Sequence, residues 1–176
     1  MIKNSYKSVV VLFAICFVIS AALAAVNYIT SPVIEQAEKD ATQAALKVVM
    51  ESADSFASVD IAGLPSSVTE AYIARCGEET VGAVLKLSVT GYAKGLTLIC
   101  GVSSSGKITG IKFISGGETL GKEKTYGESF VGKDVSGASE VDTIAGATLT
   151  TKAYKGAVTD ALEAYGKVIA KGGADK

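Results

Sequence analysis

A run of apolar residues near the N-terminus sets the strongest limit on what this chain can fold into. No charged side chain occurs over residues 8–32, and residues 9–26 are apolar except for Ser20. At about 1.5 Å per residue, a helix of this length reaches across the ~30 Å hydrocarbon core of a bilayer. We therefore expect a transmembrane anchor over residues 8–30, with the short N-terminal segment 1–7 on one side and the rest of the chain on the other.

The charges that flank the apolar run predict its orientation. Lys3 and Lys7 precede it, and Glu35 is the first charged residue that follows. By the positive-inside rule, the N-terminus is cytoplasmic and the remaining chain is an extracytoplasmic domain held at the cell membrane by a single pass. The alternative is a cleaved signal peptide, because Ala22-Leu23-Ala24 offers an A-x-A site. The run is longer than a usual signal core, and both interpretations export the domain.

Composition limits the function classes of the exported part. The chain has 176 residues, a formal net charge of −1 and no His. Such a charge gives no basic surface for nucleic acid, and without His neither Ser-His-Asp nor Cys-His catalysis can be assembled within the chain. The sequence contains no Cys-x-x-Cys pair, which argues against a zinc or iron–sulfur site. We therefore predict no catalytic residue, no metal ligand and no nucleic-acid partner.

The pattern of apolar residues beyond the anchor predicts an α+β fold. Thr30-Ser31-Pro32 predicts a helix start, and we expect this helix to continue from the anchor and to reach about Glu51. Residues 31–67 would form this helix and a connection, and residues 68–176 the domain. Runs rich in Val, Ile, Leu and Tyr, separated by Gly- and Ser-rich turns, predict an antiparallel sheet with strands at residues 70–76, 80–90, 96–102 and 108–115. A loop-rich stretch over 116–143 and a helix over 150–171 complete the prediction.

Two cysteines fall in the exported part of the chain. Cys76 and Cys100 lie in separate predicted strands, and an oxidising exterior would permit a disulfide between them. Sequence spacing leaves open whether their α-carbons come close enough for that bond.

The segment 142–148 has the pattern D-x-x-x-G-A-T and precedes the C-terminal helix. It ends at Thr148, which is followed by Leu149, Thr150 and Thr151. A threonine hydroxyl is a weak nucleophile that needs an activating group, so chemistry on Thr148 requires a second protein. The ordinary alternative is a loop that ends in a hydroxyl N-cap, since helices often begin at Ser or Thr.

The segment resembles the D-x-x-[ST]-G-A-T sequence on which bacterial flavin transferases esterify a threonine with FMN. The chain is thus similar to the FMN-binding domain family, and within it to the G subunit of the Rnf complex and the C subunit of the sodium-pumping NADH:quinone oxidoreductase. The resemblance implies covalent FMN in phosphoester linkage to Thr148 and a flavin transferase that recognises Asp142, Gly146 and Ala147. The family usually has Ser or Thr where this chain has Ala145.

Weaker motifs extend the resemblance. Gly91-Tyr92-Ala93-Lys94-Gly95 looks like the G-Y-x-G turn of FMN-binding domains, and Glu118-Thr119-Leu120-Gly121 looks like their E-T-P-G-L-G segment. The further cofactor-binding candidates are Tyr92, Glu118, Thr119, Gly146, Ala147, Leu149, Thr150 and Thr151. The free N–H groups of the following helix are additional phosphate donors. The alternative for Tyr92 is a hairpin turn whose ring packs on the sheet, and for Glu118 and Thr119 a solvated loop.

The resemblance implies an electron-transfer flavoprotein. The chain would be the G-type subunit of an Rnf-type complex, which links ferredoxin oxidation and NAD reduction to Na⁺ or H⁺ translocation, with the other membrane subunits as partners. Three alternatives stay open: a C-type subunit of the NADH:quinone pump, a free-standing extracytoplasmic flavoprotein, and an anchored binding domain without a cofactor.

Overall fold

The computed structural model describes residues 2–117, 121 and 123–172. The chain divides into two compact units, Met1–Asp40 and Ala41–Lys176. The first helix, α1 (Ile2–Val49), contributes to both units. Among the described residues, α1 is the one helix long and apolar enough to cross a membrane.

The first unit consists of α1 up to Asp40, and Pro32 lies inside this helix. The predicted continuation from the anchor is confirmed, but the prediction of a new helix start at Thr30-Ser31-Pro32 was wrong. Proline already has a helical φ and removes one N–H donor, so a helix can pass through it at the cost of one hydrogen bond. The Thr30 hydroxyl donates to the main-chain carbonyl of Val26 at 2.9 Å, so it is bound within the helix and caps no helix start.

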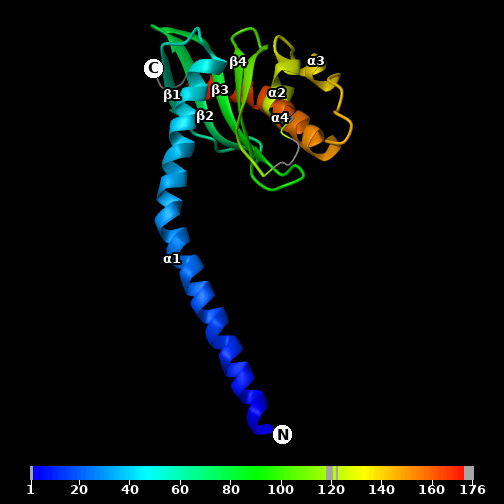
Figure 1. The fold of residues 1–176 in the computed structure, drawn as a ribbon. Coiled ribbons are helices and arrows are strands. Elements are labelled where there is room, and N and C mark those ends of the chain that lie inside the picture. The colour runs from blue at the N-terminus through cyan, green and yellow to red at the C-terminus, as the bar shows by residue number, and fades with distance from the viewer. Residues whose placement is uncertain (1, 118–120, 122, 173–176) are drawn as a thin grey trace. The chain divides into compact units, whose positions relative to one another are not determined.

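The second unit contains the predicted antiparallel sheet, with one strand more than expected (Figure 1). The strands follow one another in the order β1-β2-β3-β4-β5, and each pairs with its neighbour in antiparallel register. Their bounds are β1 (Ser55–Val59), β2 (Val68–Cys76), β3 (Glu79–Val89), β4 (Leu96–Ser103) and β5 (Ile108–Ser115). Strand β1 falls in the stretch predicted as a polar connection, so the sheet starts before residue 68.

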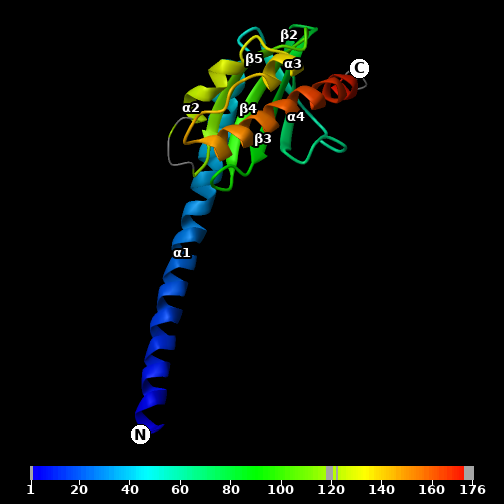
Figure 2. The same cartoon turned by 90° about the vertical axis from the view of Figure 1, so that its right-hand side faces the viewer.

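Short helices follow the sheet where the sequence predicted a loop. They are α2 (Glu123–Tyr126), the 3₁₀ helix η1 (Gly127–Phe130) and α3 (Val135–Ser139). The Asp134 side chain caps α3 by accepting a hydrogen bond from the Gly137 N–H at 2.9 Å. The long helix α4 (Thr148–Gly172) then crosses one face of the sheet (Figure 2).

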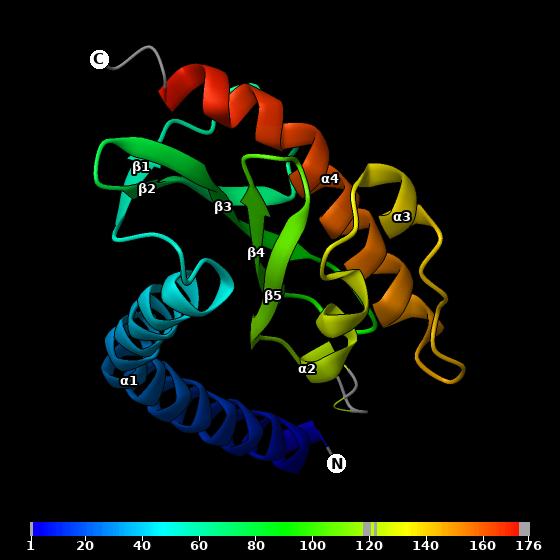
Figure 3. The same ribbon diagram turned by 90° about the horizontal axis from the view of Figure 1, so that it is seen from above.

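The two faces of the sheet are covered by different helices. Alternate residues of each strand point toward α4, where the main core contains Leu85, Leu98, Val158 and Ala161, all fully buried. On the opposite face a smaller core forms between the sheet and the end of α1 (Figure 3). Its members are Ala45, Leu46, Val49, Met50, Ala74, Val84 and Ile99. The last turns of α1 are therefore part of the domain.

Glycines let the end of α1 approach the sheet closely. An added Cβ at Gly101 would lie 2.7 Å from the carbonyl oxygen of Val49, and one at Gly110 would lie 3.2 Å from the Val49 Cα. A side chain at either position would therefore push the helix end away from the sheet. The Thr109 hydroxyl also donates to the Val49 carbonyl, which fixes the place where α1 ends.

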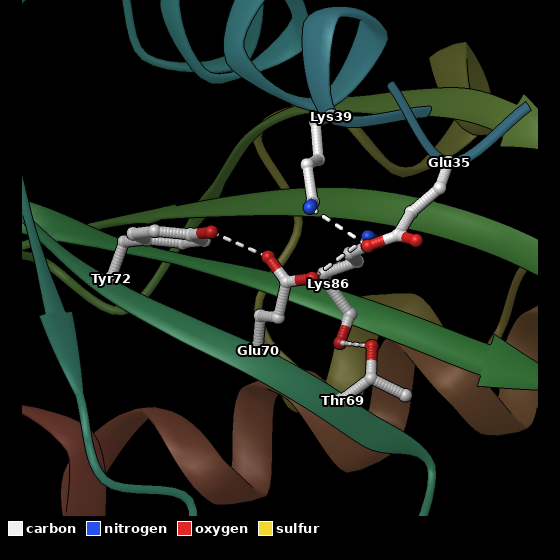
Figure 4. Close-up of polar contacts among 6 residues, drawn as sticks. All are labelled: Glu35, Lys39, Thr69, Glu70, Tyr72 and Lys86. Atoms are coloured by element: carbon white, nitrogen blue, oxygen red, sulfur yellow. Dashed lines mark hydrogen bonds and ion pairs between the residues drawn. The ribbon is translucent and has the colours of Figure 1, made fainter. Parts of the chain in front are cut away.

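A polar cluster ties β2 to β3 on the same face of the sheet (Figure 4). The Glu70 carboxylate pairs with the Lys86 ammonium at 2.8 Å and accepts a hydrogen bond from the Tyr72 hydroxyl. Burial, and then the neighbouring Glu70 carboxylate, raise the pKa of Tyr72 to about 12, so its hydroxyl stays protonated as a donor. Figure 4 also shows the Glu35–Lys39 ion pair one turn apart within α1. The Glu70–Lys86 ion pair joins β2 to β3, while Tyr72 contacts Glu70 within β2.

Candidate functional site

The segment 142–148 connects α3 to α4 and ends in a tight turn. The Ala147 N–H donates to the Ile144 carbonyl at 3.0 Å, and Gly146 has φ +81° with no atom within 4 Å of an added Cβ. Glycine is the residue that adopts this left-handed conformation without steric cost. Gly146 is thus required by the turn itself, whether or not a transferase also recognises it.

Thr148 is the first residue of α4, two residues before the predicted start. The Ala147 carbonyl accepts the first hydrogen bond of the helix, from the Thr151 N–H at 2.9 Å, which makes Ala147 the N-cap residue. Because alanine has no hydroxyl, the alternative of an ordinary hydroxyl N-cap is wrong for this turn. The Thr148 side chain is exposed and is not required for capping.

The residues after Thr148 differ sharply in their exposure. Leu149 is 64% exposed, whereas Thr150 and Thr151 are 6% and 1% exposed. The Thr151 hydroxyl donates to the Ala147 carbonyl at 3.0 Å, so its hydrogen bond is made within the first turn of α4. Of the predicted threonines in this turn, Thr148 alone combines helix N-terminal position with an exposed side chain.

Two side chains from other elements hold the start of the segment. The Tyr126 hydroxyl donates to the Asp142 carbonyl at 2.9 Å, and the Lys155 ammonium donates to the Val141 carbonyl at 3.0 Å. Burial, and then the charge of the Asp142 carboxylate, raise the pKa of Tyr126, which keeps its hydroxyl protonated. The Asp142 residue itself is exposed.

An aromatic cluster supports Tyr126 beneath the segment. Its ring lies 5.2 Å from that of Phe130 and 5.2 Å from that of Tyr154, edge to face in both cases. The Tyr154 hydroxyl is buried and has no hydrogen-bond partner among the residues that the structure describes. Gly127 packs against that hydroxyl, so a Cβ there would collide with it.

The β3–β4 turn places Tyr92 at one end of the sheet. Tyr92 is 68% exposed, so its ring does not pack on the sheet as the alternative predicted. Gly117, just after β5, adjoins the same turn, because an added Cβ there would lie 3.1 Å from that of Ala93. The first turn of α4 lies toward this end of the sheet as well (Figures 1 and 2). Glu118 and Thr119 lie outside the described residues.

Cys76 and Cys100 are too far apart to form a disulfide in this fold. Cys76 is opposite Glu79 on β3, while Cys100 is opposite Leu85. Six residue steps along β3 correspond to roughly 20 Å, far beyond the ~7 Å limit between bridged α-carbons. Both thiols are free. Within the described ranges, no group of three or more His, Cys, Asp or Glu side chains could hold a metal ion.

Comparison with known proteins matches both parts of the chain. Residues 91–163 match the FMN-binding domain, and residues 1–49 match the RnfG N-terminal region. The predicted resemblance to the FMN-binding domain family is thus confirmed over these residues. The matched range begins in the turn that contains Tyr92 and extends past Thr148 into α4.

Two curated relatives match over most of their length. The G subunit of the Na(+)-translocating ferredoxin:NAD(+) oxidoreductase complex from Acetobacterium woodii is 29% identical, covering 93% of this chain and 92% of the relative. The G subunit of the proton-translocating ferredoxin:NAD(+) oxidoreductase complex from Clostridium ljungdahlii is also 29% identical, covering 84% of each. The similarity thus includes the N-terminal helix as well as the region that matches the FMN-binding domain.

The residues at the start of α4 fit a bound FMN phosphate. The first amides of a helix lack carbonyl partners within it, and the helix dipole favours an anion there. Lys152 is exposed one turn after Thr148, on the same side of α4. Sequence reasoning missed Tyr126 and Lys155, whose targets are main-chain carbonyls. No pattern of residue types in the sequence could have found these two contacts.

Proposed function

We propose that this chain is the membrane-anchored G-type subunit of an Rnf-type electron-transfer complex and carries FMN covalently on Thr148. The observation that carries the proposal is the exposed Thr148 at the N-terminus of α4, within the D-x-x-x-G-A-T segment of an FMN-binding domain. The names of both curated relatives support the assignment to such a complex.

Attachment would require a flavin transferase and a flavin dinucleotide donor. The Thr148 Oγ–P bond forms while the phosphoanhydride P–O bond of the donor breaks, so that AMP leaves and the hydroxyl proton passes to a base of the transferase. The chain has no His to act as that base. Asp142, Gly146 and Ala147 would be recognised by the transferase, with Asp142 exposed and Gly146 setting the turn.

After attachment, the first amides of α4 would hold the remaining charge of the phosphoester. Thr148 tethers the cofactor, and the exposed Leu149 and Tyr92 are the apolar surfaces available to its ring at this end of the domain. Bound FMN supplies one- and two-electron redox chemistry. A covalent tether prevents loss of the cofactor from an extracytoplasmic domain.

The anchor gives the chain its place in the complex. With the N-terminus in the cytoplasm, as the flanking charges predict, α1 crosses the membrane once and the flavin domain is extracytoplasmic. The other membrane subunits of the complex would be its partners. The two relatives are named for different ions, and both have 29% sequence identity to this chain. Sequence identity therefore does not favour Na⁺ or H⁺ as the coupling ion.

The test combines attachment with activity. Coexpression with a flavin transferase should give fluorescence that persists through denaturing electrophoresis and a mass increase of one FMN less water, both lost in Thr148→Val. In membranes with the assembled complex, reduced ferredoxin should drive NAD⁺ reduction with the wild-type chain but not with Thr148→Val, although the variant still copurifies with its partners. Full activity with Thr148→Val would contradict the relay role.

A further inference from the structure

We propose that Tyr126 and Lys155 are positioning residues that present the segment 142–148 to the flavin transferase in its folded shape. The proposal rests on the covalent attachment proposed above and adds how the acceptor is recognised. Neither residue belongs to the D-x-x-x-G-A-T pattern, and neither is among the candidate cofactor contacts.

The two residues hold successive carbonyls from two different elements. Tyr126, at the end of α2, donates to the Asp142 carbonyl at 2.9 Å. Lys155, in α4, donates to the Val141 carbonyl at 3.0 Å. Both donors are partly or fully buried, and a lysine held in one conformation loses considerable side-chain entropy. The two hydrogen bonds hold the backbone at Asp142, the first residue of the segment, and at Val141 directly before it.

The other end of the segment is fixed as well. Ala147 is 6% exposed, its N–H binds the Ile144 carbonyl, and its own carbonyl accepts from Thr151. Between these ends, Asp142, Ala145 and Gly146 are exposed. The segment is thus a surface turn with both ends held, and it displays Asp142 and Thr148 on one ordered piece of backbone.

An acceptor segment that is already ordered lowers the conformational entropy that is lost when the transferase binds it. A transferase that binds a flexible peptide must order its backbone at the moment of binding, whereas a pre-organised turn has already done so in folding. Tyr126→Phe keeps the ring in its aromatic cluster and removes only the hydroxyl. Lys155→Met keeps most of the apolar stem and removes only the ammonium. Tyr126→Phe therefore deletes the hydrogen bond to Asp142, the first residue of the segment, and Lys155→Met the one to Val141 directly before it.

The experiment measures the rate of FMN attachment to the full chain in detergent, with purified transferase and FAD, by intact mass over time. A lost hydrogen bond of net ~0.5–1.5 kcal/mol corresponds to about a 2- to 10-fold slower initial rate for each variant, and we expect a larger loss in the double variant. The KM for the chain should rise while each variant stays cooperatively folded, with a thermal midpoint only a few degrees below that of the wild type. Lys155→Arg, which keeps a donor, should recover part of the rate.

Lys167→Met is the matched control. Lys167 lies on the same helix and also donates to a main-chain carbonyl, that of Gly63 at 3.2 Å, but it does not contact the segment. The Lys167→Met chain should acquire FMN at the wild-type rate. Equal or faster labelling of Tyr126→Phe and Lys155→Met would overturn this proposal alone, as would a peptide of residues 138–152 that labels as fast as the folded chain. No labelling of the wild-type chain would overturn the attachment itself, and the positioning role with it.

Discussion

The Thr151 hydroxyl donates to the main-chain carbonyl of Ala147 at 3.0 Å and thereby closes the first turn of α4. Thr151 is 1% exposed, while Thr148 on the same turn is exposed. Two chemically identical side chains therefore have opposite roles here. One stabilises the helix start, and the other is exposed and is the proposed acceptor of FMN.

Thr151→Val should separate these two roles. Valine keeps the shape of the side chain but loses the hydroxyl, so the domain should lose about 1 kcal/mol in its free energy of unfolding. FMN attachment should continue, because the acceptor is unchanged. Chemical denaturation and intact mass of the same sample measure the two quantities. Loss of the adduct in a folded Thr151→Val chain would point to Thr151 as the acceptor.

Gly101→Ala should displace the end of α1 from the sheet. The new methyl group would lie 2.7 Å from the Val49 carbonyl oxygen and 2.5 Å from the Thr109 hydroxyl oxygen, and such overpacking costs about 1–3 kcal/mol. Gly156→Ala is the control, because this glycine lies in α4 with nothing within 4 Å of an added Cβ. There alanine should stabilise the helix by about 0.5–1 kcal/mol. Equal stability of the two variants would mean that α1 does not pack on Gly101.

A fragment of residues 41–176 should fold without the anchor, and one of residues 51–176 should not. The shorter fragment lacks Leu46, Val49 and Met50, which cover one face of the sheet. Each such side chain contributes about 1.5–3 kcal/mol when buried, which together approaches the whole ~5–15 kcal/mol stability of a domain. Thermal unfolding followed by circular dichroism distinguishes a cooperative transition from its absence. A cooperative transition in both fragments would show that α1 is dispensable.

The thiols of Cys76 and Cys100 should differ in their reactivity toward iodoacetamide. Cys100 is fully buried, and burial raises its pKa to about 12. Cys76 is exposed, but a hydrogen bond to the Asp54 carboxylate raises the pKa of its thiol, so the reactive thiolate is scarce near neutral pH. In the native Cys16→Ala chain, we expect slow labelling of Cys76 and none of Cys100, with faster labelling of Cys76 in Asp54→Asn. An unchanged rate in that variant would contradict the role of Asp54.

Most of the sheet could be predicted because its strands bury alternating apolar residues. Strand β5 agrees with the predicted range, and β2, β3 and β4 differ from theirs by at most two residues at an end. Strand β1 was missed because its five residues, SFASV, do not alternate between polar and apolar, and it pairs with β2 alone at the edge of the sheet. Buried and exposed residues do not alternate along this strand, so the sequence lacks the two-residue period that predicts a strand.

The acceptor segment was visible in the sequence, but its supports were not. Thr148 and Gly146 belong to a recognisable pattern, whereas Tyr126 and Lys155 act on main-chain carbonyls, which leave no mark on the residue types at positions 141 and 142. The helix α1 continues through Pro32 without a break, whereas the sequence predicted a helix start there. A proline inside a helix and a proline in its first turn cannot be told apart from residue type alone.

The most direct test of the central claim is to locate the flavin on the chain after coexpression with a transferase. Trypsin should release residues 134–152 as one peptide, since Lys133 precedes it and Lys152 ends it. Fragmentation of this peptide should place one FMN, less water, on Thr148, and the Thr148→Val peptide should carry none. An adduct on Thr143, Thr150 or Thr151, or one that persists in Thr148→Val, would contradict the account.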